Sequence, residues 1–584
     1  MTIVRKAGSL AVIGSGISGL SFAYYLSYFR PDIKITIFEK SSRTGGYISS
    51  PLDNKSHKVI LEKGPRTLRT ASDGTLMIAD LFQRCGRCDE VYGVAKTSLG
   101  NKKYILDWQN HLVEAPSSFY TAWNFLFGGN LLTKGLINDI LKEPWRPGPI
   151  ITQDESVEGF FSRRFGPRVT DNVVSAIYNG IYAGDVGDLS IRSVMPRLFD
   201  VKKSHRSVVL AHITSRLANG LFTGVKGLFR AGLTMLGLLK KKWGGGSDLL
   251  RHYQCEFSTG NVWFLKNILK KMPIISLKNG MESVTNLLRD QLQGISNVKY
   301  VYDCDISGIK NGEKGITISY THNGTEHRDI FDHINCTVSP KGLSDMVEDP
   351  KLSNLLKAPT YSKVRLVNFY LRNKNYIQDS PGFGYLIPKA YYKHNPGLKH
   401  QAILGVIFDS DVEKHRSQIF NPATKRFSAK LGETVEEYKR NLINGEDWKN
   451  KGTDKEIAQY KGEFHEVSST QEYTKLTLMM GGHYWKNEVI PNEATALLNA
   501  KDVLKKQLNI DLNEISEDDL IIETAMTDEG IPQYNVGFED TKQEILDKVD
   551  VLYQGKLTVS GMSFNGGVGV PDCVSNGYKL AAHM

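Results

Sequence analysis

The sequence has too few cysteines for a disulfide framework. Only six occur among 584 residues, and they are widely spaced, whereas small secreted domains that depend on disulfides carry them far more densely. Cys85 and Cys88 form one C-x-x-C pair, but a zinc site of this kind needs a second pair at similar spacing. The 14 histidines show no H-E-x-x-H motif. The sequence therefore predicts neither structural disulfides nor a metal site.

A membrane-spanning segment is also lacking. No apolar run reaches the ~18 residues that a spanning helix needs. The first residues, MTIVRKAGS, are basic, but only about eight residues precede the first predicted strand, which is short for a cleaved transit peptide. We find no aromatic-and-basic nucleic-acid module. The 73 basic and 63 acidic residues give a net charge of +10, which suits an anionic ligand or membrane surface.

The N-terminal 40 residues have the pattern of a dinucleotide-binding β-α-β unit. A buried strand is predicted over residues 9–13, a helix over 17–29 and a second strand over 33–39. The turn GSGISG joins the first strand to the helix and has the G-x-G-x-x-G spacing. The unit therefore predicts a nucleotide whose pyrophosphate lies at the helix N-terminus.

Each glycine of this turn has an expected task. Gly14 permits the tight turn, Gly16 lets the backbone approach a pyrophosphate, and Gly19 lets the helix pack on the strand. Glu39, about 20 residues past the last glycine, is expected to accept a hydrogen bond from a ribose hydroxyl. Ser15, Ile17 and Ser18 complete the predicted contact segment.

The residues after the second strand indicate which dinucleotide binds. Glu39, Arg43, Gly45 and Gly46 have the spacing E-x-x-x-R-x-G-G. This resembles the extended signature of the amine-oxidase-like flavoprotein superfamily, in which the second glycine turn and its arginine wrap FAD. LEKGPRTLR, residues 61–69, resembles the loop that these enzymes place beside the isoalloxazine ring.

The end of the chain is rich in glycine in a way that suits the same cofactor. A strand is predicted over 556–564, followed by a glycine turn and a helix with Pro571 and Asp572 in its first turn. In this superfamily the chain returns here, and the positive end of the helix would stabilise negative charge on reduced flavin. A side chain on the turn glycines would hinder that approach.

Six further segments narrow the resemblance. They are NGIYAGDVGDLSIRSVMPRLF (179–199), GFGYLIP (382–388), LGVIFDS (404–410), LTLMMGG (476–482), IPQYNVG (531–537) and GVGVPDC (567–573). With GPRTLR, they resemble the protoporphyrinogen IX oxidase family of the mitochondrial type over most of the chain. The resemblance implies oxidation of protoporphyrinogen IX, the penultimate step of haem synthesis, with hydride transfer to flavin N5, dioxygen as acceptor and hydrogen peroxide as product. We predict no catalytic base.

The resemblance also implies contact residues for FAD. They are Gly14, Ser15, Gly16, Ile17, Ser18, Gly19, Glu39, Lys40, Arg43, Gly45, Gly46, Tyr47, Gly64, Pro65, Arg66, Thr67, Ile306, Met562, Val568, Gly569 and Val570. Many relatives have Trp at the position of Tyr47, and either ring could pack on the cofactor. Ile306 is placed in a strand over VYDCDISGI, where its backbone would meet the adenine.

The substrate carries two propionates at one end and apolar rings elsewhere, so its site should be mostly apolar with one cation. Lys103 stands where plant and animal relatives have an arginine proposed to pair with a propionate; it acts alone, shares the charge with Lys102, or is simply solvated. Gly180 is expected near the pyrrole N–H groups, beside Asn179. Leu366 is either an apolar wall or plain core.

Residues 214–243 carry an amphipathic helical pattern with cationic polar residues, closed by Lys-Lys-Lys-Trp. This predicts a helix in the plane of a bilayer, or else one packed on its own core. The resemblance implies a monotopic protein on the outer side of the mitochondrial inner membrane. Residues 411–472 are highly charged and are predicted to be a surface insertion.

The fold class expected is α/β, with three parts. A Rossmann-type FAD domain is assembled from residues 1–95, 272–345 and 553–584, a mixed-sheet substrate domain from 96–116 and 346–552, and a helical membrane-binding domain from 117–271. A homodimer and a contact with ferrochelatase are family-level expectations. Two alternatives stay open: another FAD oxidase acting on amines or lipids, and a non-enzymatic carrier resembling GDP-dissociation inhibitors.

Overall fold

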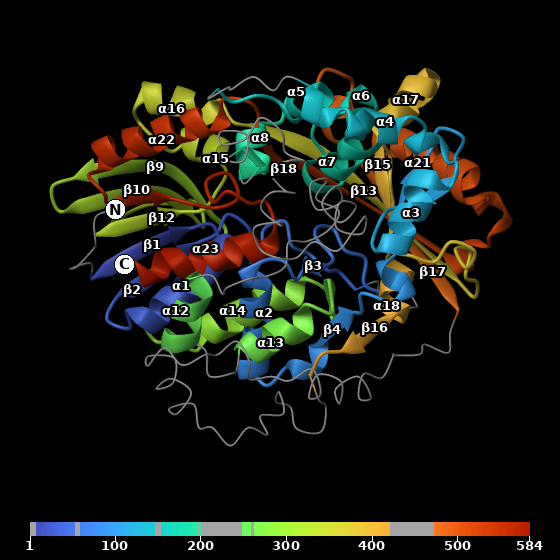
Figure 1. Ribbon diagram of the computed structural model, residues 1–584. Helices are drawn as coiled ribbons and strands as arrows, with labels where there is room; N and C mark the ends of the chain where they lie inside the picture. Colours follow the sequence, from blue (N-terminus) through green and yellow to red (C-terminus); the bar gives the residue numbers. More distant parts are fainter. Residues whose placement is uncertain are drawn as a thin grey trace, which may run out of the picture.

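The computed structural model describes residues 8–52, 59–146, 153–196, 198–199, 248–257, 262–420 and 472–584. The amphipathic segment predicted over 214–243 lies outside the described residues. So does most of the insertion predicted over 411–472. Figure 1 shows the two main sheets at opposite sides of the molecule, with helices packed above and below them.

A parallel sheet of five strands is built from three distant parts of the chain. Its order is β19-β12-β1-β2-β8. The strands are β1 (Ser9–Ile13), β2 (Lys34–Phe38), β8 (Val298–Val301), β12 (His333–Cys336) and β19 (Leu557–Val559). Helix α1 (Ile17–Phe29) connects β1 to β2, as the N-terminal pattern predicted. Because β1 lies in the middle, the glycine turn that follows it opens at the centre of the sheet edge.

Two predicted strands differ from the observed ones. The strand expected over VYDCDISGI is divided, because Asp303 has a φ of 48° and turns the chain between β8 and β9 (Cys304–Gly312). Ile306 therefore belongs to a separate antiparallel sheet of β9, β10 (Gly315–His322) and β11 (Thr325–Phe331). The strand expected over 556–564 ends at Val559, and Gly561, with a φ of 97°, begins a turn.

A mixed sheet of seven strands forms the other side of the molecule (Figure 1), in the order β18-β13-β17-β15-β14-β5-β6. Its strands are β5 (Lys103–Leu106), β6 (Leu112–Glu114), β13 (Thr360–Arg372), β14 (Gly384–Leu386), β15 (Ile403–Phe408), β17 (Tyr473–Gly481) and β18 (Leu520–Gln533). One face carries a large apolar core that includes Val367, Phe369 and Leu371 of β13. Since side chains alternate along a strand, Leu366 and Asn368 point to the opposite face.

A four-stranded antiparallel sheet has the order β16-β4-β7-β3. It contains β3 (Leu68–Arg69), β4 (Val91–Val94), β7 (Ile274–Leu277) and β16 (Arg416–Gln418). The first residues of the predicted insertion belong here and are not a surface segment. Asp411, Ile419 and Phe420 are buried, so any insertion begins after residue 420.

The helices cover the sheets in two groups. Those near the parallel sheet are α2 (Asp73–Arg84), α12 (Asp248–Glu256), α13 (Val262–Leu269), α14 (Glu282–Gln293), α15 (Pro340–Ser344), α16 (Pro350–Lys357), α22 (Phe538–Tyr553) and α23 (Val570–Ala582). Those near the mixed sheet are α3 (Phe119–Phe127), α4 (Leu136–Leu141), α5 (Val157–Phe165), α6 (Pro167–Val169), α7 (Ser175–Tyr182), α8 (Ile191–Val194), α17 (Lys389–His394), α18 (Asp409–Lys414) and α21 (Glu493–Leu508).

Candidate flavin and substrate site

The first glycine turn has the geometry that a dinucleotide needs. Gly14 has a φ of 93°, and its N–H donates to the carbonyl of Phe38 at 2.9 Å. A Cβ on Gly19 would lie 2.0 Å from the carbonyl oxygen of Gly14, so the helix packs on the strand only with glycine there. A Cβ on Gly16 would meet no atom within 4 Å. Gly16, Ile17 and Ser18 are partly exposed, which leaves the start of α1 accessible to a ligand.

The second glycine turn is bound directly to the first. The N–H of Gly45 donates to the carbonyl of Ser15 at 2.9 Å, and Gly45 has a φ of 109°. The guanidinium of Arg43 donates to the carbonyls of Thr44, Ile48 and Gly46 at 3.1, 3.1 and 2.7 Å. Arg43 thus holds the shape of the turn through backbone carbonyls.

Glu39 lies directly after β2 and contacts the first glycine turn. Its carboxylate accepts from the N–H and hydroxyl of Ser15 at 2.9 and 2.6 Å, and from the N–H and hydroxyl of Ser41, both at 2.9 Å. A ribose hydroxyl would replace one of the two serine hydroxyls. Lys40 is exposed and pairs with Asp305 of β9 at 3.1 Å.

Three helices begin at the same place. A Cβ on Gly577 would lie 2.8 Å from the backbone nitrogen of Phe22, so α23 lies close alongside α1. Tyr578 and Tyr25, further along the two helices, are also in contact, with ring centroids 5.0 Å apart, so α1 and α23 run parallel. A Cβ on Gly74, in the first turn of α2, would lie 1.7 Å from the carbonyl oxygen of Pro571. The positive ends of three helix dipoles therefore meet, as an anionic cofactor requires.

The C-terminal glycine turn lies at this meeting point. Gly566 has a φ of 73°, and a Cβ there would meet no atom within 4 Å. The carbonyl of Met562 accepts from the hydroxyl of Tyr534 at 2.5 Å, which fixes the start of the turn. Val568 and Gly569 are partly exposed, and Val570 begins α23.

Asp572 caps α23 from within its first turn. Its carboxylate accepts from the N–H of Gly569 at 3.1 Å and from the hydroxyl of Ser72, the N-cap of α2, at 3.2 Å. Burial raises the pKa of Asp572 above its usual range, and these two hydrogen bonds partly offset the rise. One carboxyl group thus joins the starts of two helices.

The loop Gly64–Thr67 lies between the parallel sheet and the mixed sheet. A Cβ on Gly64 would lie 2.2 Å from the carbonyl oxygen of Tyr47, so this loop packs against the second glycine turn. Tyr47 itself is 47% exposed, which leaves its ring available to a ligand. The Arg66 side chain is buried and reaches Asp409 of α18 at 3.3 Å, while Pro65 and Thr67 are half-buried.

The strand register of the mixed sheet aligns apolar side chains in a row. Leu366 pairs with Met479, Met479 with Gly405, Gly405 with Leu386, and Leu386 with Ile105. Residues paired across strands point to the same face. This is the face opposite the large core, and Asn368 on it donates to the carbonyl of Glu62, two residues before Gly64, at 3.2 Å. The row therefore forms an apolar floor that faces the loop Gly64–Thr67.

The same register places Lys103 on this floor. On each strand, the residue two positions from the first row belongs to a second row on the same face. This second row contains Asn368, Thr477, Ile407, Gly384 and Lys103. The Lys103 ammonium donates to the side-chain oxygen of Asn101 at 3.0 Å and is exposed. A solvent-accessible cation thus stands at the far end of an apolar surface.

Helix α7 closes one side of the floor. A Cβ on Gly180 would lie 2.7 Å from a methyl carbon of Leu386, so the helix packs on the floor at that residue. Asn179 is buried, and its amide donates to the carbonyl of Ile387 at 2.9 Å. Its amide nitrogen is thus bonded within the fold, and Asn179 is a positioning residue here.

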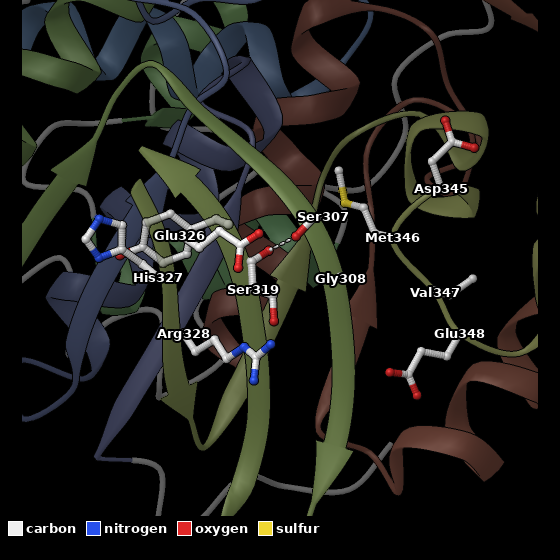
Figure 2. Close-up of a pocket in the computed structure, with 11 residues that line it drawn as sticks. Ser307, Gly308, Ser319, Glu326, His327, Arg328, Asp345, Met346, Val347 and Glu348 are labelled. Carbon is white, nitrogen blue, oxygen red and sulfur yellow. Dashed lines mark hydrogen bonds between the residues drawn. The ribbon is translucent and has the colours of Figure 1, made fainter. Parts of the chain in front are cut away.

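A separate hollow of about 300 Å³ lies on the small antiparallel sheet of β9, β10 and β11. Figure 2 shows Ser307, Ser319 and Arg328 on its strand side and Asp345 and Glu348 across from them. None of the predicted cofactor or substrate residues lines it. Ile306 is half-buried on the neighbouring strand position, near the exposed pair of Lys40 and Asp305.

The structure brings most predicted residues to one region, and it adds others. Met479, Leu386 and Ile105 complete the floor, and Asp409 and Thr477 contact its polar edge. Sequence reasoning missed them because segments such as LTLMMGG and LGVIFDS carried only the family resemblance and gave no sign of which strand face is used. Alternation along those strands, combined with the register, was the information needed.

Comparison with known proteins agrees with this geometry. The family model for flavin containing amine oxidoreductase matches residues 17–375, more than half of the chain. Protoporphyrinogen oxidase from Saccharomyces cerevisiae is 31% identical over 100% of this chain and 99% of its own length. The protein of the same name from Schizosaccharomyces pombe is 28% identical over 99% of this chain and 98% of its own length.

A solved structure of reduced UDP-galactopyranose mutase has a TM-score of 0.59 and 13% identity, and covers 100% of this chain and 94% of that one. This likeness supports the fold alone. The cofactor of the matched family is a flavin, and the two joined glycine turns, Gly14–Gly19 and Gly45–Gly46, form a cradle that fits FAD. The chain therefore belongs to the flavin-containing amine oxidoreductase family and, within it, to the protoporphyrinogen oxidases.

Proposed function

We propose that this protein oxidises protoporphyrinogen IX to protoporphyrin IX with FAD and dioxygen, and so catalyses the penultimate step of haem synthesis. The proposal is carried by the full-length similarity to a protoporphyrinogen oxidase. The geometry supports it, because an open dinucleotide cradle and an apolar floor with one accessible lysine lie against the same loop. The alternative amine or lipid oxidase has no comparable support over the whole chain.

FAD, when bound, accepts hydride and passes it to dioxygen. The chain's own part is to hold and orient. The two glycine turns, joined through Gly45 and Ser15, hold the pyrophosphate, and Glu39 holds the ribose. Lys40, Tyr47 and the loop Gly64–Thr67 would flank the cofactor. The backbone near Ile306 would hold the adenine, and Met562 and Val568–Val570 would hold the flavin ring. The N-terminal ends of α1, α2 and α23 would stabilise negative charge on the bound cofactor.

The mixed sheet orients the substrate. Leu366, Met479 and Leu386 offer an apolar surface for the pyrrole rings, and Gly180 allows α7 to lie close to it. Lys103 at the end of the floor pairs with a propionate. With no charged group in the row of Leu366 and Met479, the reacting carbon lies in a dry environment, and catalysis depends on position.

Exposed aromatic side chains on the helical part support attachment to a membrane. Tyr120, Trp123 and Phe127 on α3 are 72, 47 and 51% exposed, and Trp145 is 82% exposed. Tyrosine and tryptophan favour the interface between lipid and water. Among the described residues, the helices are all too short or too polar to cross a bilayer. These side chains support binding to a membrane surface, and the intermembrane-space side of the mitochondrial inner membrane stays a family-level prediction.

The three-part division into FAD, substrate and membrane domains is part of this proposal. It rests on the parallel sheet, the mixed sheet and the apolar cluster of helices α3–α8, which packs on Ile105 of the mixed sheet. The homodimer and the contact with ferrochelatase stay predictions.

An anaerobic mixing experiment tests the function. The purified protein, with its visible spectrum recorded, is mixed with protoporphyrinogen IX, and air is then admitted. We expect the flavin to bleach and then recolour, with porphyrin fluorescence and peroxide. A flavin spectrum that does not respond to porphyrinogen would redirect the search to amines and lipids, and folded protein that binds no flavin would contradict the cofactor assignment.

A further inference from the structure

Asp409 lies in a buried chain of hydrogen bonds at the polar edge of the floor. The amide nitrogen of Asn368 donates to the carbonyl of Glu62 at 3.2 Å. This fixes the amide so that its oxygen faces Thr477, whose hydroxyl lies 2.6 Å away. The same hydroxyl lies 2.7 Å from Oδ2 of Asp409. Asn368, Thr477 and Asp409 are all buried.

This chain of hydrogen bonds needs one more hydrogen than it has when Asp409 is ionised. A threonine hydroxyl carries a single hydrogen, so it can donate to only one of two oxygens. The amide oxygen of Asn368 and an ionised carboxylate are both acceptors, and either contact without a hydrogen would set two lone pairs against each other at hydrogen-bond distance. If the Asn368 amide is rotated by half a turn, its oxygen instead faces the carbonyl oxygen of Glu62, and these two acceptors then have no hydrogen between them. A proton on Oδ2 of Asp409, donated to Thr477, satisfies every contact.

The contact between Asp409 and Arg66 agrees with a neutral acid. Its two nitrogen–oxygen distances are 3.3 and 3.4 Å, whereas charge-assisted pairs are typically about 2.7–2.9 Å. A neighbouring ion pair, Lys475 with Glu413, is 2.6 Å.

We propose that Asp409 is a protonated carboxylic acid that donates to Thr477 and does not neutralise the positive charge of Arg66 beside the flavin. This inference rests on the proposed function for the position of the flavin. Asp409 is a positioning residue that acts through Arg66. The remaining charge favours the anionic reduced cofactor in a buried site, where its effect is larger than in water.

Several charged groups surround Asp409 and Arg66. The charged groups that line a cavity of about 40 Å³ together with Asp409 are Glu62, Arg66, Lys278, Glu413, Arg416 and Lys475. Glu413 is bonded to Lys475, and Arg416 donates to the hydroxyl of Ser276 at 2.9 Å. Glu62 accepts from the hydroxyl of Ser50 and the N–H of Met281, and burial raises its pKa.

The substitution Asp409→Asn tests the proton directly. An asparagine amide can donate to Thr477 as the acid does, so we expect an unchanged unfolding midpoint and an unchanged flavin reduction potential. If Asp409 is instead ionised, the substitution removes a charge. The potential would then rise, and the midpoint of unfolding would fall because Arg66 loses its anion.

Thr477→Val is the complementary variant. It removes the acceptor for the Asp409 proton, so Asp409 ionises and pairs with Arg66. We expect the equilibrium constant for flavin reduction to fall by about tenfold or more. Thr477→Ser, the matched control, and Thr477→Val combined with Asp409→Asn should both keep the parent potential. A fall that persists in the double variant would overturn the proposal.

An infrared spectrum of the folded protein needs neither flavin nor activity. We expect a stretching band of a protonated carboxyl that Asp409→Asn removes and that Asp411→Asn, two residues along α18, retains. A parent spectrum unchanged by Asp409→Asn would overturn the proposal. Because this measurement works on flavin-free protein, a failure to bind flavin would count against the proposed function only.

Discussion

The N–H of Gly45 donates a hydrogen bond of 2.9 Å to the carbonyl of Ser15, and this bond joins two glycine-rich turns that are 30 residues apart in the chain. Arg43 donates hydrogen bonds to three backbone carbonyls at the second turn, so its guanidinium stabilises the shape of that turn. The cradle is thus one unit with two turns.

Gly16 and Gly19 should respond differently to the same substitution. Gly16→Val projects into space that holds no protein atom within 4 Å, so we expect a folded protein with FAD binding weakened by about tenfold or more. Gly19→Val collides with the carbonyl of Gly14 and should lower the unfolding midpoint. Retained flavin absorbance and thermal unfolding measure the two effects. Normal flavin content in Gly16→Val would contradict the cradle.

Leu366 and Leu371 offer a matched pair on the two faces of β13. Leu371→Ala opens the large core and should destabilise the protein by ~2–5 kcal/mol. Leu366→Ala should cost less stability, because this side chain is half-buried, but raise KM for the porphyrinogen by about tenfold. Equal KM values for the two variants would make Leu366 an ordinary packing residue.

Lys103 should be needed for the propionate and replaceable by another cation. We expect Lys103→Met to raise KM about three- to tenfold, because the pair is exposed to water, and Lys103→Arg to retain binding. The effect should shrink at high salt. Lys102→Met is the control; if it has the same effect, the two lysines share the charge.

Asp572 should make stability depend on pH in a predictable direction. Burial raises the pKa of this carboxyl in the folded state. Its contribution to stability is therefore complete below the unfolded pKa of about 3.9 and is lost as pH rises through the folded pKa. We expect the unfolding midpoint of the parent to fall relative to that of Asp572→Asn over this window. Glu62 and Asp411, whose pKa values burial also raises, are present in both proteins and cancel in the difference. A constant difference would show that Asp572 has an ordinary pKa.

Trp145 should contribute to membrane attachment. We expect Trp145→Ser to weaken binding to anionic lipid vesicles by about tenfold, as suits the loss of one large aromatic side chain from the interface. Val551→Ser, on α22 and 73% exposed, is the control and should bind as the parent does. Equal binding by the two variants in a sedimentation assay would show that Trp145 does not contact the membrane.

Local patterns in the sequence were enough for the cofactor end. The strand, turn and helix from Ser9 to Phe29 agree with the expected ranges, because G-x-G-x-x-G and the apolar periodicity depend on neighbours within a few residues. The division at Asp303 was missed because an αL turn there has no strong sequence signal. The packed segment 411–420 was missed because its charged residues find their partners, such as Lys475 for Glu413, about 60 positions away.

The sequence by itself determined the nucleotide-binding unit, the flavin signature and the family resemblance, since each depends on residue identity at short, fixed spacings. The tertiary structure decided which face of β13 and β17 is the floor, that three helix starts converge, and that Asp409 reaches Thr477 and Arg66. Register and long-range contacts arise from packing between segments hundreds of residues apart, and a shift of one residue would turn every floor side chain to the other face.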